Sequence, residues 1–315
     1  MNWTAIAQDY LNQRRLLGYA LVSEGRCILD FSVFADKQQT QPVTIALAHD
    51  WASRAPSGSD IAISRRFSML RPFFRYASGI EQSVPVLPKR YVGITHRRLA
   101  PFIFSDSLIL QLMEASKTLA SRQGLRPATM QTLIGLLAST GLRPGEAVRL
   151  ARAAINHTTG EIHIYDSKNW RHRIVPLSPS TLCALEHYQS IRDRIKPIPT
   201  SDAFFLRDDG QPLDIAAADY AFSLLRKQLD LTSALNGHLP RLYDLRHSFV
   251  CKRIISWYHA GVNVDALMPQ LSRYLGHKKV TATYWYISAI PELMDCAAHN
   301  FTHFSKKGDS DERDY

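Results

Sequence analysis

Apolar residues recur at helical spacing along most of the chain, and the period shifts towards alternation only after residue 150. Near the N-terminus, residues 9–21, 42–53 and 63–79 each place apolar side chains on one face. This periodicity predicts that residues 1 to about 80 are helical.

The second part of the chain mixes helices with a short β segment. The alternating stretches "EIHIY" and "HRIVP" predict a β-hairpin that carries Lys168 in or beside its turn. The stretch "AFFLRDDGQPL" predicts a further strand and turn. Cap residues and periodicity predict helices from about Ser105, from about Pro127 to Gly141, from Ser178 to Arg194, from Asp214 to Leu229, from Tyr243 to Ala260 and over 264–276.

These elements predict a mostly α (α+β) protein, with a helical N-terminal domain and a mainly helical second domain that contains a small antiparallel sheet. The N-terminal domain is assigned to residues 1–82 and the second domain to residues 105–304. Between them, residues 83–104 form a basic linker with Lys89, Arg90, Arg97 and Arg98. The acidic tail, 305–315, is expected to be disordered.

Composition points to a polyanionic partner. The 315 residues contain 38 Lys and Arg against 28 Asp and Glu, a difference of +10. The four cysteines are far apart, so no structural metal is expected. The N-terminus lacks a secretory signal and no long apolar run occurs, which predicts a cytoplasmic protein.

Arginines alternate with apolar residues in the stretch 63–79. On a helix they flank one apolar face, where they can contact DNA phosphates. The alternative is a solvated rim whose side-chain stems cover the core. The residues concerned are Arg65, Arg66, Arg71 and Arg75.

Four further polar residues lie where the chain enters or leaves an element: Arg143, Lys168, Arg246 and His277. Together they could bind a phosphate without a metal, because guanidinium groups bind nonbridging oxygens and lysine can donate a proton. Each also has a simpler explanation. Arg143 could pair with Glu146, Lys168 could be a solvated turn residue, and His277 could cap the preceding helix.

The order of the motifs resembles one family. "TGLRPGEAVRL", "SKNWRHRIVPL", "YDLRHSF" and "LGH", followed nine residues later by Tyr286, resemble the tyrosine recombinase (phage integrase) family over about residues 105–300. The stretch "SRRFSMLRPFFRY" is similar to the family's core-binding domain. The ending "TYWYIS…PEL" looks more like recombinases of transposons and mobile elements.

The resemblance implies a role for each matching residue. Arg143 and Arg246 match the two catalytic arginines, with Glu146 supporting the first, and His277 matches the residue that hydrogen-bonds the scissile phosphate. Lys168 matches the general acid, and Tyr286 matches the nucleophile.

One position departs from the family pattern, because Tyr243 stands where the family usually has histidine. A phenol with an ordinary pKa near 10 is a poor proton acceptor at neutral pH. Tyr243 is interpreted as a tolerated variant. His247 points about 100° away from Arg246 on a helix and is interpreted as structural.

By resemblance, the protein is expected to cleave and rejoin duplex DNA through a 3′-phosphotyrosyl intermediate, without a cofactor or metal. Four subunits are expected to act on two sites, and "IPELMDCAAHNF" could dock on a neighbour or pack on its own domain. Two alternatives stay open. One is a noncatalytic DNA-binding regulator or decayed recombinase, which Tyr243 favours, and the other is a type IB topoisomerase-like enzyme.

Overall fold

The computed structural model divides the chain into two compact units, Met1–Arg98 and Leu99–Tyr315. The predicted linker spans this division, and its role as a linker stays a prediction. The predicted fold class is confirmed, because the chain is mostly helical with one small antiparallel sheet. The structure describes residues 1–38, 43–89, 91, 100–166, 171–198, 201–231, 239–289 and 293–294.

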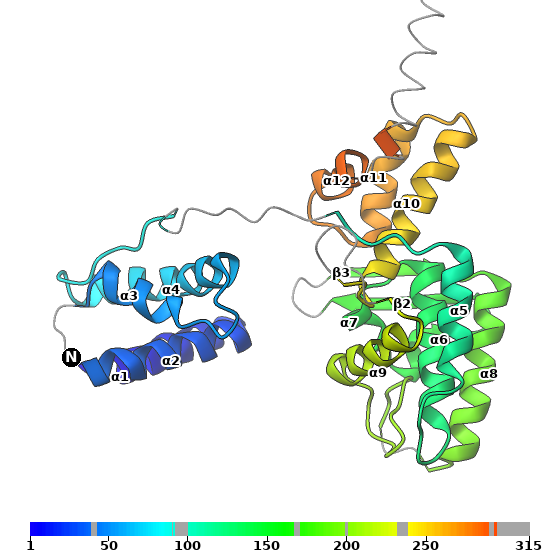
Figure 1. Cartoon of the computed structure of the whole chain (residues 1–315), viewed down its shortest axis with the longest axis horizontal. Helices are drawn as coiled ribbons and strands as arrows, with labels where there is room; N and C mark the ends of the chain where they lie inside the picture. The colour runs from blue at the N-terminus through cyan, green and yellow to red at the C-terminus, as the bar shows by residue number, and fades with distance from the viewer. Residues whose placement is uncertain are drawn as a thin grey trace, which may run out of the picture. The chain divides into compact units, whose positions relative to one another are not determined.

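The N-terminal unit is built from four helices (Figure 1). Side-chain oxygens of Asn2, Thr44 and Ser59 accept hydrogen bonds from the first turns of the first, third and fourth helices, which explains where these begin. Their apolar faces enclose an aromatic core that includes Trp51 and Phe74. The helices are α1 Trp3–Leu16, α2 Val22–Gln38, α3 Ile45–Ser53 and α4 Asp60–Ile80.

The second unit contains the remaining helices and the sheet. The helices are α5 Asp106–Ser116, α6 Leu125–Thr140, α7 Pro144–Ala147, the 3-10 turn η1 Arg152–Ala154, α8 Pro179–Ile195, α9 Ile215–Gln228, α10 Asp244–His259, α11 Val264–Leu275 and α12 Thr281–Ala289. The strands are β1 Ile155–Asn156, β2 Glu161–Asp166 and β3 Arg171–Pro176, paired antiparallel in the order β1-β2-β3.

The predicted hairpin and helix boundaries in this unit are largely confirmed. Ser105, Ser178 and Asp214 cap the helices that follow them, and Gly141 and Gly276 end helices in the left-handed conformation. The predicted strand in "AFFLRDDGQPL" is wrong. In this segment the structure has only isolated bridges, one of which joins Leu206 to Pro212. Proline has no N–H to extend a ladder.

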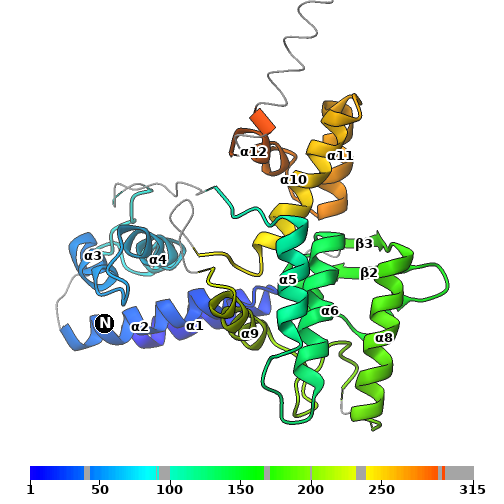
Figure 2. The same ribbon diagram turned by 45° about the vertical axis from the view of Figure 1, so that its right-hand side comes forward.

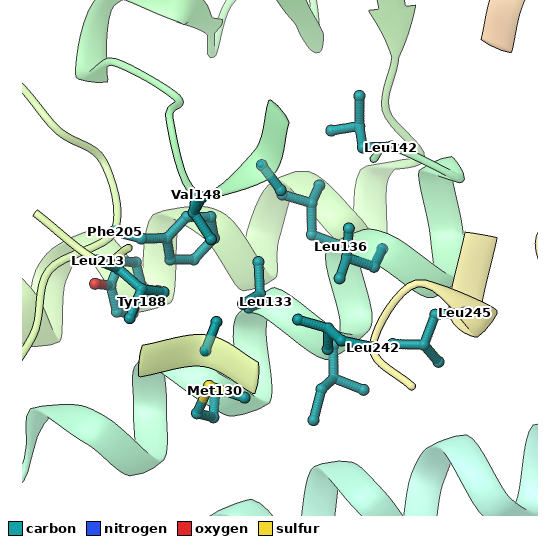
Figure 3. Close-up of a cluster of buried hydrophobic side chains, with 14 of the residues drawn as sticks. Met130, Leu133, Leu136, Leu142, Val148, Tyr188, Phe205, Leu213, Leu242 and Leu245 are labelled. Atoms are coloured by element: carbon teal, nitrogen blue, oxygen red, sulfur yellow. The ribbon is translucent and has the colours of Figure 1, made fainter. Parts of the chain in front are cut away.

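A single apolar core fills the body of this unit (Figure 3). Met130, Leu133 and Leu136 of α6 meet Tyr188 of α8 and Leu245 of α10 in this core. Helices α5, α6 and α8 therefore form a packed layer to which the start of α10 is fixed.

The rest of α10 leaves this body and carries α11 and α12 at one end of the unit (Figures 1 and 2). Here a second cluster of buried side chains joins Cys251 and Ile254 of α10 to Met268 and Leu271 of α11 and Tyr286 of α12. Tyr286 is therefore anchored by packing of three helices.

Within the described part of the chain, no helix is both long and apolar enough to cross a lipid bilayer.

We predict that Gly141→Ala destabilises the second unit by at least about 2 kcal/mol. Its φ of +63° is unfavourable for alanine, and an added Cβ would lie 2.3 Å from a ring carbon of Phe249. Gly124→Ala at the other end of α6 is the control, because its φ is also positive but nothing lies within 4 Å. It should cost only about 1 kcal/mol. Urea unfolding of the full chain followed by circular dichroism measures both, and equal effects would contradict the predicted clash.

Candidate active site

The short helix α7 positions Arg143 and Glu146. Arg143 is the N-cap residue, between the left-handed Gly141 and the helix-starting Pro144. Its backbone N–H donates to Glu146 Oε2 at 3.0 Å, and its Nη1 donates to Glu146 Oε1 at 2.6 Å. The carboxylate therefore fixes both the backbone and the guanidinium of Arg143.

Arg173 of β3 is a second partner of Glu146 that the sequence analysis did not find. Its two terminal nitrogens donate to the two carboxylate oxygens at 3.1 and 2.7 Å. Burial alone would raise the pKa of Glu146, but the hydrogen bonds and charges of Arg173 and Arg143 outweigh it and lower the pKa to about 2. The carboxylate is thus ionised at any physiological pH.

Arg246 lies in the first turn of α10 and is 1% exposed. Its Nη1 donates to the carbonyl of Gly141 at 2.8 Å, and its Nη2 donates to the carbonyl of Leu275 at 2.7 Å. The same Nη2 lies 3.1 Å from Nε2 of His277. One buried guanidinium therefore joins the ends of α6 and α11 to the start of α10.

His277 follows the left-handed Gly276 that ends α11. Because an arginine N–H can only donate, Nε2 of His277 accepts from Arg246, which assigns the ring proton to Nδ1. Nδ1 lies 2.8 Å from the hydroxyl of buried Thr283. Both ring nitrogens are therefore oriented by partners.

Gly276 lies against two guanidinium groups. Its carbonyl accepts a hydrogen bond from Arg143 Nη2 at 2.9 Å, and a Cβ here would lie 3.0 Å from Arg173 Nη1. Its φ of +66° also disfavours other residues. This glycine allows the two arginines to approach the turn that carries His277.

The arrangement favours an anion. Burial and then the positive charge of Arg143 lower the pKa of Arg246. A guanidinium stays protonated, so the lowered pKa means that the positive charge of Arg246 is unfavourable where it lies. A negative group bound nearby would reduce this unfavourable energy. Arg143 is partly exposed, with 33% of its side chain accessible, so an anion can reach it from solvent.

Tyr286 is 3% exposed, and its phenol oxygen lies 2.7 Å from Nδ1 of His247. The sequence predicts only that His247 points away from Arg246, and the contact with Tyr286 could not be read from that direction. A rotation of about 100° per residue does turn His247 away from Arg246. That rotation directs it towards α12, where the ring of Trp285 also contacts it at a centroid distance of 6.0 Å.

The second tyrosine of α12 has a different environment. Tyr284 is 38% exposed and donates to Asp265 of α11 at 3.0 Å. Only Tyr286 of this pair contacts His247 among the contacts described.

Tyr243 precedes α10 and is 38% exposed. Burial would lower the pKa of Arg143, but Glu146 and the Tyr243 phenol outweigh this and raise it, so the phenol lies near that guanidinium. The Tyr243 ring also meets the ring of His247 edge-on at 5.1 Å. The residue at the family's histidine position therefore borders both Arg143 and His247.

Several predicted residues are not brought into this site. Lys168 lies outside the described residues, as do Arg90, Arg97 and Arg98. In the N-terminal unit, Arg65, Arg75 and Lys89 are exposed, and Arg71 is half-buried. Arg66 stacks over the Trp51 ring at 4.1 Å and pairs with Asp30, which favours the structural alternative for this residue.

The described residues contain no group of three or more His, Cys, Asp or Glu side chains arranged to hold a metal ion.

Comparison with known proteins shows the family of the chain. The sequence model of the phage integrase family matches residues 104–292. A putative integrase/recombinase y4rB of Sinorhizobium fredii is 32% identical over 91% of this chain and 93% of its own length. The chain belongs to the phage integrase family.

Other members of the family are more distant. Tyrosine recombinase XerD of Staphylococcus saprophyticus is 25% identical over 80% of this chain and 78% of its own length. The Tn1549 transposon integrase, solved in complex with transposon right end DNA, has a TM-score of 0.69 and 15% identity, with 97% of this chain and 100% of that chain covered. The protein is thus a tyrosine recombinase or integrase with the corresponding fold.

We predict that Glu146 makes the stability of the second unit depend on acid pH. Its folded pKa of about 2 is below the ordinary 4.5, so its contribution is present above pH 4.5 and is lost as pH falls towards 2. The difference in free energy of unfolding between the wild type and Glu146→Gln should therefore shrink between pH 5 and pH 3. Urea unfolding at both pH values measures it, and a constant difference would contradict the assignment.

Proposed function

We propose that this protein is a site-specific recombinase that cleaves and rejoins duplex DNA through a 3′-phosphotyrosyl intermediate. The observation that carries the proposal is the buried contact of Arg246 with His277, beside Arg143 and next to the helix that carries Tyr286. These are the residues that the family motifs select, and together they form a positive site beside a phenol.

Each residue has a role in the proposed reaction. The oxygen of Tyr286 forms a bond to the scissile phosphorus, and the bond from phosphorus to the 5′ oxygen breaks. Lys168 gives a proton to that leaving oxygen. Arg143, Arg246 and His277 stabilise the charge that develops on the nonbridging oxygens, and each contact is worth about 3 to 4 kcal/mol. The covalent intermediate conserves the phosphodiester, so a 5′ hydroxyl can reseal it.

The N-terminal unit is proposed to bind DNA backbone, which fits a chain with a net charge of +10. Arg65 and Arg75 of α4 are exposed and can reach phosphates, whereas Arg66 is occupied by Trp51 and Asp30. Lys89 and the other basic residues of the linker are proposed to add contacts.

The biological role we propose is integration or transposition of a mobile element, by a tetramer that acts on two DNA sites in the cytoplasm. Relatives named integrase/recombinase and a solved transposon integrase of the same fold support this role. The four-subunit assembly follows from the family resemblance.

We predict that Tyr286→Phe abolishes the covalent protein–DNA adduct, because the substitution removes only the attacking oxygen. The substrate is a duplex selected by binding from fragments of the DNA that flanks the gene, with a nick beside the cleavage point to trap the intermediate. Denaturing gel electrophoresis measures the adduct. Tyr284→Phe is the matched control, since this tyrosine lies two residues away and pairs with Asp265.

The wild type and Tyr284→Phe should both form the adduct. No adduct with the wild type on a bound duplex would indicate a noncatalytic DNA-binding protein, and an adduct with Tyr286→Phe would remove Tyr286 from its role. Transfer of the trapped strand to a second duplex separates a recombinase from a topoisomerase-like enzyme, which reseals its own strand.

We predict that Tyr243→His leaves the cleavage rate within about tenfold of the wild type or raises it. Imidazole is the better proton acceptor at neutral pH. Its N–H, placed beside Arg143, can still donate a hydrogen bond to the DNA phosphate. Single-turnover cleavage of the same nicked duplex measures the rate. Complete loss of cleavage would show that the phenol has a specific role.

A further inference from the structure

The contact between His247 and Tyr286 is not among the roles that the family resemblance implies, although both residues lie within the quoted motifs. Nδ1 of His247 lies 2.7 Å from the phenol oxygen, within the range of a strong hydrogen bond. The two residues are 39 positions apart and come from α10 and α12. Tertiary packing of these helices therefore brings an imidazole to the proposed nucleophile.

Resting on the proposed function, we propose that His247 is the base that removes the phenol proton from Tyr286 during strand cleavage. The O–H bond of Tyr286 breaks and its proton passes to Nδ1 of His247. The phenol oxygen bonds to phosphorus, the bond to the 5′ oxygen breaks, and Lys168 supplies the proton to that oxygen. Resealing returns the proton from His247 to Tyr286.

His247 is better suited to this step than the neighbouring groups. An imidazole has an ordinary pKa near 6.5, whereas a phenol has one near 10 and is a poor proton acceptor at neutral pH. Tyr286 is 3% exposed, so water has little access to its proton. Nε2 of His277 accepts a hydrogen bond from Arg246 at 3.1 Å, so the lone pair of this nitrogen is already engaged.

Several ionisable groups face this pair. Arg246 of α10 interacts electrostatically with Tyr286, and Tyr243, which precedes α10, lies edge-on to His247. Cys251 of α10 shares the buried cluster with Tyr286. A negative charge on Tyr286 raises the pKa of Arg246, and by reciprocity Arg246 favours the phenolate. Its positive charge also disfavours imidazolium, so a bound DNA phosphate should assist the transfer by adding negative charge.

The test is the pH dependence of single-turnover cleavage of the nicked duplex between pH 5.5 and 8. In the wild type the rate should rise with pH as His247 loses its proton, and then level off. His247→Asn keeps a hydrogen-bonding group near the position of Nδ1 but removes the base. Its rate should fall by about 10²- to 10⁴-fold at pH 7 and continue to rise with pH.

Two further measurements separate base catalysis from a purely structural role. Added imidazole should partly restore cleavage by His247→Asn, and 3-fluorotyrosine at position 286 should do the same because its phenol ionises more readily. Duplex binding, measured by gel shift, should be unchanged. Cleavage by His247→Asn with the wild-type rate and pH profile would overturn the proposal, as would a loss that neither imidazole nor fluorotyrosine relieves.

The outcomes also distinguish this inference from the proposed function. If the wild type forms no adduct, the recombinase mechanism itself fails. If the wild type forms the adduct through Tyr286 and His247→Asn retains the same profile, only the role of His247 fails.

Discussion

The site depends on the burial of one charged group, the guanidinium of Arg246. A buried charge is costly unless its hydrogen bonds are satisfied, and here the carbonyls of Gly141 and Leu275 and the Nε2 atom of His277 supply partners. Those atoms belong to the ends of α6 and α11 and to the turn after α11. The hydrogen bonds of this one side chain therefore hold the ends of α6 and α11 against the start of α10, and they fix the position of His277.

The second constraint is the charge balance around Glu146. Its carboxylate binds both Arg143 and Arg173. Arg246 lies nearby, and its pKa is lowered first by burial and then by the positive charge of Arg143. Among the described residues of the site, three guanidinium groups thus face one carboxylate. Glu146 holds two of them without neutralising the set, so the site remains favourable for a phosphate. The left-handed Gly276 permits this crowding because it has no side chain.

The proposed nucleophile belongs to a different packing unit from the arginines. Tyr286 is anchored in the cluster formed by α10, α11 and α12, whereas Arg143 and Glu146 lie on α7 beside the main core. Helix α10 connects the two environments, since Arg246 in its first turn faces the anion site and His247 faces α12. A change in the packing of α12 would therefore move the phenol relative to the arginines without disturbing the core.

The sequence alone determined the helix ends, the hairpin and the order of the motifs, because these follow from local rules: capping oxygens at Ser105 and Ser178, left-handed glycines at 141 and 276, and alternation in β2 and β3. The resemblance of these motifs to the family then pointed to Arg143, Arg246, His277 and Tyr286 as candidate site residues. Only the tertiary structure decided that Arg173 shares Glu146, that Arg66 covers Trp51, and that His247 meets Tyr286. These contacts join residues up to 39 positions apart in the sequence. Periodicity within one helix gives the direction in which a side chain points. Which residue of another segment it meets is decided by the packing of the whole unit.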